Sequence, residues 1–333
     1  VTSITRYIQP IRLFRFLTPA ILFATIPSGP ARATPPKSDE PASSSRIAIL
    51  FGKQKSYRAS ASALKKLLEE TGARCVGVEL PGKKDTKGRD RILETLGAPD
   101  IRLIAAAGKD AVSFALEKIT KTPVLFFQVP NVPDTPFMRT DRPPPRLAGI
   151  TIDVRPEAQL EWIRKLCPRA RTIALLHSRR TERTVEAFRR AAEKSPVRVI
   201  PILAGKSRFP DAIDALNSSG CDGVLMIPDA RVYNVATIKR LLLWGLRKKK
   251  PVWTFSAHVV KAGATAGLYA DTDATVRQTA ELIRKILEGA DPKTIGLRYP
   301  DRVERSVNLH TIQAIDAGIN LNVVRATRKK FGE

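Results

Sequence analysis

Short apolar runs alternate with amphipathic stretches from Arg46 almost to the end of the chain. Short apolar runs bounded by turn-forming residues are typical of buried strands. We expect strands at 47–51, 75–78, 101–106, 124–127, 172–176, 197–203, 223–227 and 252–255. The stretches between them space their apolar residues three and four apart, as on one face of a helix. We expect helices at 59–71, 87–96, 109–119, from Pro156, and at 183–194, 210–218, 235–246 and 273–288.

Strands that alternate with helices predict parallel sheets covered by helices on both faces. The second half of the chain repeats the scheme of the first, and the stretch 135–146, rich in Pro and Arg, separates them. The predicted fold class is therefore α/β, with two doubly wound parallel-sheet lobes joined by a hinge. Ligands of such sheets sit beyond the carboxyl ends of the strands, so two facing lobes enclose a small solute by hinge closure.

The first 33 residues have the composition of a secretory signal peptide. They contain no acidic residue, and an apolar stretch at 16–24 precedes the small residues of Ala31-Arg32-Ala33. The basic residues that come first are Arg6, Arg12 and Arg15. This order is that of a cleaved export signal, and the apolar stretch is shorter than the roughly 20 residues that span a bilayer. A membrane anchor or a disordered N-terminus is the alternative.

Export predicts a soluble periplasmic protein, and no cysteine near the cleavage site offers a lipid anchor. Residues 34–45 are rich in Pro and Ser and are expected to form a flexible linker. Residues 326–333 are expected to form a basic tail.

The charge balance is strongly basic, with 57 Lys and Arg against 32 Asp and Glu and a net charge of +25. The basic residues are spread along the chain, and the densest runs are 247–250 and 328–330. Neither run contains interleaved aromatic residues or a helix-turn-helix pattern, so nucleic-acid binding is not expected. A solvated basic surface is the simplest interpretation, and weak attraction to an anionic envelope surface remains open.

The residues that carry metal, redox or nucleophilic chemistry are scattered. Cys75, Cys167 and Cys221 show no CxxC spacing, and the three histidines are isolated, so no metal site or cofactor is expected. Ser178 follows His177 directly, but no GxSxG elbow precedes it. Gly108-Lys109 lacks the rest of a phosphate-binding loop. The sequence therefore predicts a binding protein and not an enzyme.

Several stretches, in this order and spacing, are similar to a known family. They are Ala148-Gly149-Ile150-Thr151-Ile152-Asp153-Val154-Arg155-Pro156-Glu157-Ala158-Gln159-Leu160, Leu166-Cys167-Pro168, Asp222-Gly223-Val224-Leu225-Met226-Ile227-Pro228-Asp229, Lys261-Ala262-Gly263-Ala264 and Ser306-Val307-Asn308-Leu309-His310-Thr311. Over nearly all of 46–325 the chain resembles the ABC-transporter substrate-binding family that includes the tryptophan- and tyrosine-type binding proteins, with a type I periplasmic-binding fold.

The resemblance implies three crossings between lobes, near 149–153, 255–272 and 296–306. Lobe one would comprise 46–150 plus 272–297, and lobe two 151–271 plus 298–325. It also implies a monomer that captures a small molecule, such as an aromatic or other hydrophobic amino acid, for a membrane permease. The alternatives are a periplasmic sensory module that docks to a signalling receptor, and a regulator of the lac-repressor type, which would need an N-terminal helix-turn-helix.

The candidate ligand-binding residues lie where predicted strands end: Gln54, Lys109, Gln128, Asn131, His177, Asp229 and Ser256. Asp229 follows a hydrophobic strand, where a buried charge needs a partner, so it is a candidate for a ligand ammonium. The resemblance implies the same role, and the alternative is a helix cap or loop turn. Lys109 begins a helix, where a ligand carboxylate would meet both its ammonium group and free backbone N–H groups; the alternative is a solvated lysine.

Overall fold

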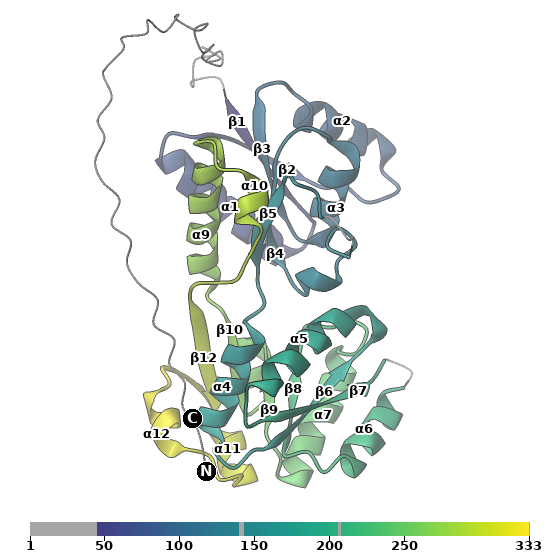
Figure 1. Ribbon diagram of the computed structural model, residues 1–333, viewed down its shortest axis with the longest axis vertical. Helices are drawn as coiled ribbons and strands as arrows, with labels where there is room; N and C mark the ends of the chain where they lie inside the picture. The colour runs from purple at the N-terminus through teal and green to yellow at the C-terminus, as the bar shows by residue number, and fades with distance from the viewer. Residues whose placement is uncertain (1–44, 140–142, 206–207, 333) are drawn as a thin grey trace, which may run out of the picture. The chain divides into compact units, whose positions relative to one another are not determined.

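The computed structural model describes residues 45–139, 143–205 and 208–332. The predicted signal peptide, and the predicted linker apart from Ser45, lie outside the described residues. The described chain is a two-lobed α/β protein built on two sheets, which confirms the predicted fold class (Figure 1).

The first sheet has six strands in the order β11-β5-β4-β3-β1-β2, and all neighbouring strands are parallel. Its strands are β1 (Arg46–Phe51), β2 (Arg74–Glu79), β3 (Ile101–Ala107), β4 (Val124–Val129), β5 (Leu147–Thr151) and β11 (Leu297–Arg298). Its helices are α1 (Lys55–Glu70), α2 (Thr86–Leu96), α3 (Lys109–Lys118), α9 (Thr272–Leu287) and α10 (Pro292–Ile295).

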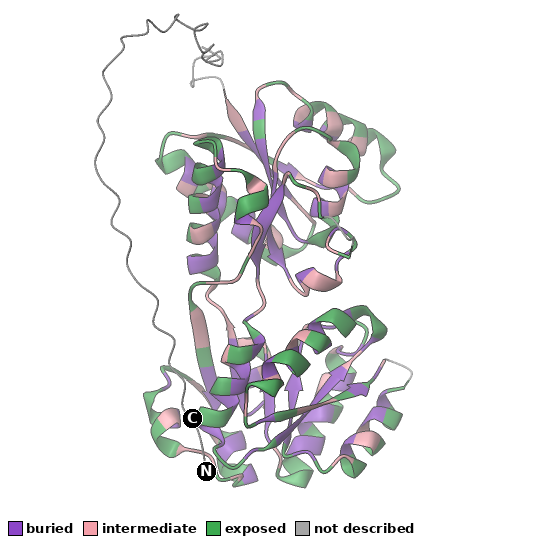
Figure 2. Ribbon diagram, in the orientation of Figure 1, coloured by how far each residue is buried: buried purple, intermediate pink, exposed green. Residues whose placement is uncertain are grey.

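Both faces of this sheet are covered because successive strand residues point to opposite sides. Ile47 and Ile49 of β1 pack in one cluster with apolar residues of α1 and α9. Ala48 and Leu50 pack in another cluster with residues of α2 and α3. Figure 2 shows the resulting pattern of buried strands between helices with exposed outer faces.

The second sheet has seven strands in the order β13-β12-β10-β9-β8-β6-β7. Its strands are β6 (Thr172–His177), β7 (Arg198–Leu203), β8 (Gly223–Met226), β9 (Val252–Thr254), β10 (Ala266–Ala270), β12 (Val303–Asn308) and β13 (Lys329–Phe331). Its helices are α4 (Pro156–Leu166), α5 (Glu182–Glu193), α6 (Phe209–Ser218), α7 (Val235–Lys248), α8 (Ala257–Lys261), α11 (Leu309–Ile315) and α12 (Leu321–Ala326). The pair β10–β12 is antiparallel, whereas the other neighbours are parallel.

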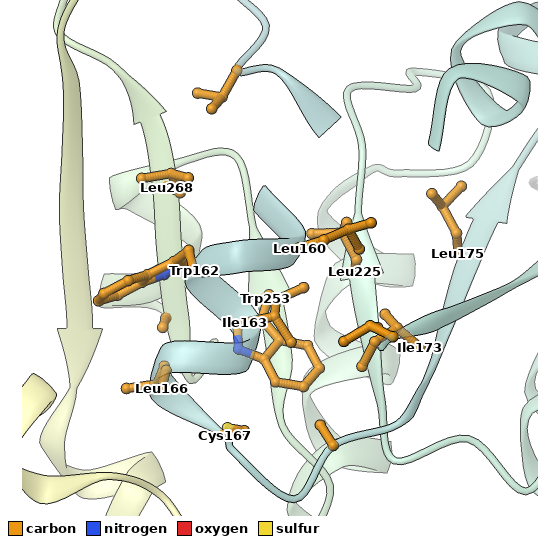
Figure 3. Close-up of a cluster of buried hydrophobic side chains, with 14 of the residues drawn as sticks. Leu160, Trp162, Ile163, Leu166, Cys167, Ile173, Leu175, Leu225, Trp253 and Leu268 are labelled. Atoms are coloured by element: carbon orange, nitrogen blue, oxygen red, sulfur yellow. The ribbon is translucent and has the colours of Figure 1, made fainter. Parts of the chain in front are cut away.

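The largest buried cluster of the second sheet lies between its strands and α4 and α5 (Figure 3). Ile173 and Leu175 of β6 belong to it, whereas Ala174 and Leu176 of the same strand face α6 and α7. Trp253 of β9 is 1% exposed and fills the space between strands and α4. Each sheet thus has its own two-sided core.

The chain passes between the two sheets three times. The segment between β5 and α4 leaves the first sheet, α9 returns to it after β10, and the segment between β11 and β12 leaves it again. The strand-end loops of both sheets lie beside these crossings, so the crossings set where the candidate residues meet.

Some elements differ from the sequence-based expectation. Residues 329–331, expected to belong to a basic tail, form β13 and pair with β12 at the sheet edge. The pattern also misses β10, a short strand that contains Gly267, and β12, whose residues are of mixed polarity. Helix α1 begins at Lys55 rather than at residue 59. The apolar pattern did not reveal this first turn, because its residues are mostly polar and exposed.

Candidate functional site

All the predicted site residues lie at carboxyl ends of strands in their own sheets. Gln54 and Lys109 follow β1 and β3, Gln128 and Asn131 belong to the end of β4 and its loop, and His177, Asp229 and Ser256 end or follow β6, β8 and β9. Parallel strands bring their carboxyl ends to one edge, which is why apolar runs followed by polar residues were informative.

The loop after β4 makes direct contact with the second sheet. The Nδ2 group of Asn131 donates a hydrogen bond to the backbone oxygen of Pro228, which precedes Asp229. Asn131 has φ 48° and Gln128 has φ 56°, a region that non-glycine residues rarely adopt. Gln128 is buried at an irregularity in the β4–β5 pairing. This unusual backbone turns Asn131 toward the other lobe.

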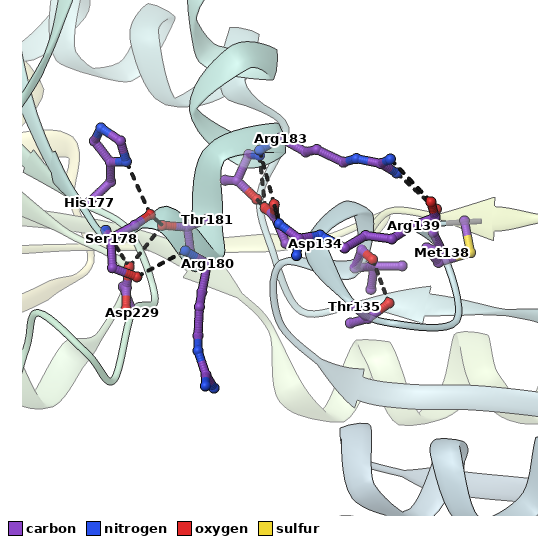
Figure 4. Close-up of polar contacts among 12 residues, drawn as sticks. Asp134, Thr135, Met138, Arg139, His177, Ser178, Arg180, Thr181, Arg183 and Asp229 are labelled. Carbon is purple, nitrogen blue, oxygen red and sulfur yellow. Dashed lines mark hydrogen bonds and ion pairs between the residues drawn. The ribbon is translucent and has the colours of Figure 1, made fainter. Parts of the chain in front are cut away.

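Asp229 is 6% exposed and holds two loops of the second sheet together (Figure 4). Its Oδ2 atom accepts hydrogen bonds from the Ser178 backbone N–H (2.8 Å) and from Thr181 Oγ1 (2.8 Å). Its Oδ1 atom accepts from the Arg231 backbone N–H (2.9 Å). These bonds fit the alternative role expected for Asp229, in which its carboxylate stabilises a loop turn. His177, beside this network, contacts the Ser178 backbone oxygen through Nδ1 (3.1 Å).

Asp134, in the 3₁₀ turn Val132–Asp134, makes a second contact between the lobes (Figure 4). Its carboxylate accepts hydrogen bonds from the backbone N–H groups of Arg183 and Thr184 (2.9 Å each) and from Thr184 Oγ1 (2.6 Å). The Arg183 guanidinium donates in return to the backbone oxygens of Met138 and Arg139. Sequence reasoning missed Asp134, because its partners lie about fifty residues away on α5.

Asp153, directly after β5, is the third carboxylate of the region. Its Oδ2 atom accepts from the Asn131 backbone N–H (2.5 Å) and from Thr151 Oγ1 (2.7 Å). Burial raises the pKa of Asp153 to about 6, although hydrogen bonds from Thr151 Oγ1 and from the backbone N–H groups of Asn131 and Val132 oppose the shift. Asp153 was not among the predicted ligand-binding residues and entered only through the family resemblance. A carboxylate two residues after a buried strand would have indicated a candidate site residue.

The other predicted residues are not joined to this group by any hydrogen bond within the described residues. Gln54 is exposed at the start of α1, and its side chain does not cap that helix. Lys109 is exposed at the start of α3, after Gly108, whose φ of +85° and close contact with Tyr57 exclude a side chain there. Ser256 precedes α8 without capping it.

Three hollows on the described surface can be compared with the candidate residues. None of the predicted site residues lines the three hollows that stand out among residues 45–139, 143–205 and 208–332. Over the same ranges, no three His, Cys, Asp or Glu side chains are grouped as a metal site would require. All three cysteines are free thiols, and burial raises the pKa of Cys75 to about 11 and that of Cys167 to about 12.

The site can therefore offer hydrogen bonds and negative charge to a ligand. Asp134, Asp153 and Asp229 each lie in a loop at the carboxyl end of a strand, on a chain of net charge +25. Carboxylates at strand ends suit a ligand that carries donors or positive charge. Two doubly wound lobes with three crossings and touching strand-end loops define a type I periplasmic-binding fold.

The family follows from the sequence match. Residues 55–330 match the family model described as ABC transporter substrate binding protein. The chain belongs to this family, which is one of substrate-binding proteins and not an enzyme class. No curated protein matches the chain.

Solved structures share the fold at low sequence identity. An ABC domain in complex with L-Trp from Streptococcus pneumoniae is 18% identical, covers 86% of this chain and 99% of its own, and has a TM-score of 0.61. A conserved domain protein from Vibrio cholerae is 15% identical, with 86% and 99% coverage and a TM-score of 0.63. The ligand-free, open structure of a substrate-binding protein with adhesive properties from Clostridium difficile is 19% identical, with 82% and 95% coverage and a TM-score of 0.65.

No helix within the described ranges is long and apolar enough to cross a bilayer.

Proposed function

We propose that this protein is the solute receptor of an ABC importer, which captures a small molecule between its lobes and delivers it to a membrane permease. The observation that carries the proposal is the family match over 55–330. On this proposal the protein acts in the periplasm as a monomer without catalysis, after removal of residues 1–33.

The contacts between strand-end loops support capture by hinge closure. Asn131 and Asp134 reach the second lobe from loops of the first, through Pro228 and the start of α5. These contacts form only when the loops approach, so they favour the closed arrangement. A ligand that contacts both sets of loops adds to that preference.

The proposed ligand is an amino acid with an aromatic or other hydrophobic side chain. The similar Streptococcus pneumoniae domain was solved with L-Trp, and the carboxylates of the site favour a ligand with an ammonium group. Gln54, Lys109, Gln128, Asn131, His177 and Ser256 remain proposed contacts, and Asp229 is proposed to contact the ligand through its remaining acceptor capacity or to position the loops that do.

A thermal-shift screen of the twenty L-amino acids and of small carboxylates and sugars tests this function. A ligand that binds only the native state at one hundred times its Kd stabilises it by about 2.7 kcal/mol, which is a clear rise in Tm. A protein whose Tm responds to no small solute would refute the receptor proposal.

A sensory module with the same site is the second candidate, since solute capture is common to both. Genes for a permease and an ATPase beside this one favour import, and their replacement by a receptor gene favours sensing. Cell fractionation tests the location, because a full-length product in the cytoplasm would contradict export.

A further inference from the structure

Two buried acceptor atoms, in residues that contact each other, have no hydrogen-bond donor among the described residues. Asp153 Oδ1 and Asn131 Oδ1 have no hydrogen-bond partner among the described residues. Their residues touch, because the Asn131 backbone N–H donates to the other oxygen of Asp153 (2.5 Å). A buried acceptor without a donor is unfavourable, and more so when it is charged, so two of them in contacting residues need an explanation.

The orientation of the Asn131 amide follows from its contact with the other lobe. Its Nδ2 group donates to the Pro228 backbone oxygen, and a carbonyl oxygen accepts only from a donor. The Oδ1 atom of Asn131 therefore faces away from Pro228. The contact between the lobes thus fixes which side of the amide is left as an acceptor.

Nearby cations of the protein are engaged elsewhere. The Arg155 guanidinium lies over the ring of Tyr299, 4.3 Å from its centroid. Arg139 lies 3.8 Å from the Asp134 carboxylate. Neither guanidinium pairs with Asp153 in the described structure, so a donor from outside the protein is the simplest complement to the two acceptors.

We propose that Asp153 and Asn131 form a subsite that binds the protonated amine of the ligand, through Asp153 Oδ1 and Asn131 Oδ1. This inference rests on the proposed function and names the ligand class as a solute with a primary ammonium group. It transfers the main ionic role from Asp229, whose carboxylate already accepts from Ser178, Thr181 and Arg231, to Asp153. Because Asn131 is oriented by Pro228, the subsite is complete only when the lobes touch.

The test compares an amine with its deaminated counterpart on matched variants. The probes are L-tryptophan with indole-3-propionic acid, and L-leucine with 4-methylpentanoic acid, together with the tightest amine of the thermal-shift screen. Isothermal titration measures their Kd for the wild type, for Asp153→Asn and for Asp222→Asn. Asp222 is a matched control because its carboxylate also accepts backbone N–H bonds, but at the amino ends of the strands and with an exposed side chain.

Asp153→Asn should weaken binding of the amine about 30-fold or more, because one partner of a buried charge pair is lost. Asp222→Asn should change Kd less than about threefold, as expected for an exposed charge. The deaminated acid should bind the wild type at least 30-fold more weakly than the amine, and it should bind the wild type and Asp153→Asn alike. Equal Kd values of the deaminated acid for the wild type and for Asp153→Asn would show that Asp153 contacts the amine and does not merely maintain the structure of the site.

An Asp153→Asn variant that binds the amine as well as the wild type does, or that loses amine and deaminated acid equally, would overturn the subsite. The comparison of the amine with its deaminated acid on the wild-type protein needs no variant. It therefore tests whether the ligand amine is recognised even if Asp153→Asn does not fold. Binding of amine-free solutes alone would overturn the subsite and leave the receptor function standing. Binding of no solute at all would overturn both.

Discussion

Removal of the Asp134 carboxylate tests the contact between the lobes. Asp134 stands in for the N-terminal cap of α5, because Thr181, at the cap position, makes no cap hydrogen bond and turns its hydroxyl to Asp229. The first N–H groups of a helix have no partner within the helix, and here those of Arg183 and Thr184 donate to Asp134. The Asp134 side chain is only 3% exposed, so water does not replace these bonds without separation of the loops.

The size of the effect follows from these bonds. Loss of an N-cap side chain is destabilising by about 0.5–2 kcal/mol, and a hydrogen bond to a charged group contributes about 1.5–3 kcal/mol. The bonds to one carboxylate are not additive, so we expect Asp134→Ala to destabilise the touching arrangement by about 2–3 kcal/mol. That corresponds to about a 30- to 150-fold change in the equilibrium between touching and separated loops.

Amide hydrogen exchange measured by NMR reads this equilibrium directly. In Asp134→Ala the amides of Arg183 and Thr184 should exchange at least 30-fold faster than in the wild type. Amides in the interior of α7, which packs on the opposite face of the same sheet, should change little and serve as the internal reference. Asp214→Ala, which removes an exposed aspartate of α6, is the matched charge control. Equal exchange rates at Arg183 and Thr184 in wild type and Asp134→Ala would refute the capping role.

Two further predictions concern stability. Burial, with a smaller contribution from the Asp134 carboxylate, raises the pKa of Asp153 from 3.8 to about 6, so the folded state binds a proton more tightly than the unfolded state. Its contribution to the free energy of unfolding is therefore largest below about pH 4 and is lost as the pH rises through 6. In urea titrations at a series of pH values, Asp153→Asn should remove up to about 3 kcal/mol of this pH dependence. The same dependence of unfolding free energy on pH in the variant and the wild type would contradict the prediction. Gly149→Ala would place Cβ 2.2 Å from the Phe126 backbone oxygen, so it should lower the free energy of unfolding by about 1–3 kcal/mol in thermal melts. Gly205→Ala, with open space around the added Cβ, should leave the stability unchanged. Equal Tm values for the two variants would show that the backbone around residue 149 shifts to accept the methyl group.

The sequence predicted most of the fold because both cores depend on regular patterns. Buried strands such as 124–127 are continuous apolar runs, and helices such as 273–288 show a 3.6-residue period, so both could be read locally. Strand β12 was not predicted because its first half carries the charged residues Glu304 and Arg305, and its antiparallel partner β10 is short and contains a glycine. Their pairing depends on segments far apart in the chain, which one-dimensional patterns do not encode.

The placement of the candidate residues at strand ends was predictable, but their contacts were not. The rule that polar residues after buried strands gather at one edge led to Asn131 and Asp229, which lie in the loops where the lobes touch. It did not reveal that Asp229 would be shared by Ser178 and Thr181, or that Asp134 would cap a helix of the other lobe. Those arrangements follow from loop conformations, such as the φ of 48° at Asn131, which have no local sequence signature.

Helix α9 has a consequence for how the molecule is made. It supplies Val276, Ile283 and Ile286 to the core beneath the first sheet, although the whole stretch from β6 to β10 precedes it in the chain. During synthesis from the N-terminus, α1 covers only part of this apolar sheet face, and the rest stays exposed until α9 has been made. Such a surface invites aggregation or chaperone binding in the interval. The lobe whose synthesis began first therefore cannot complete its core until most of the second lobe has been made.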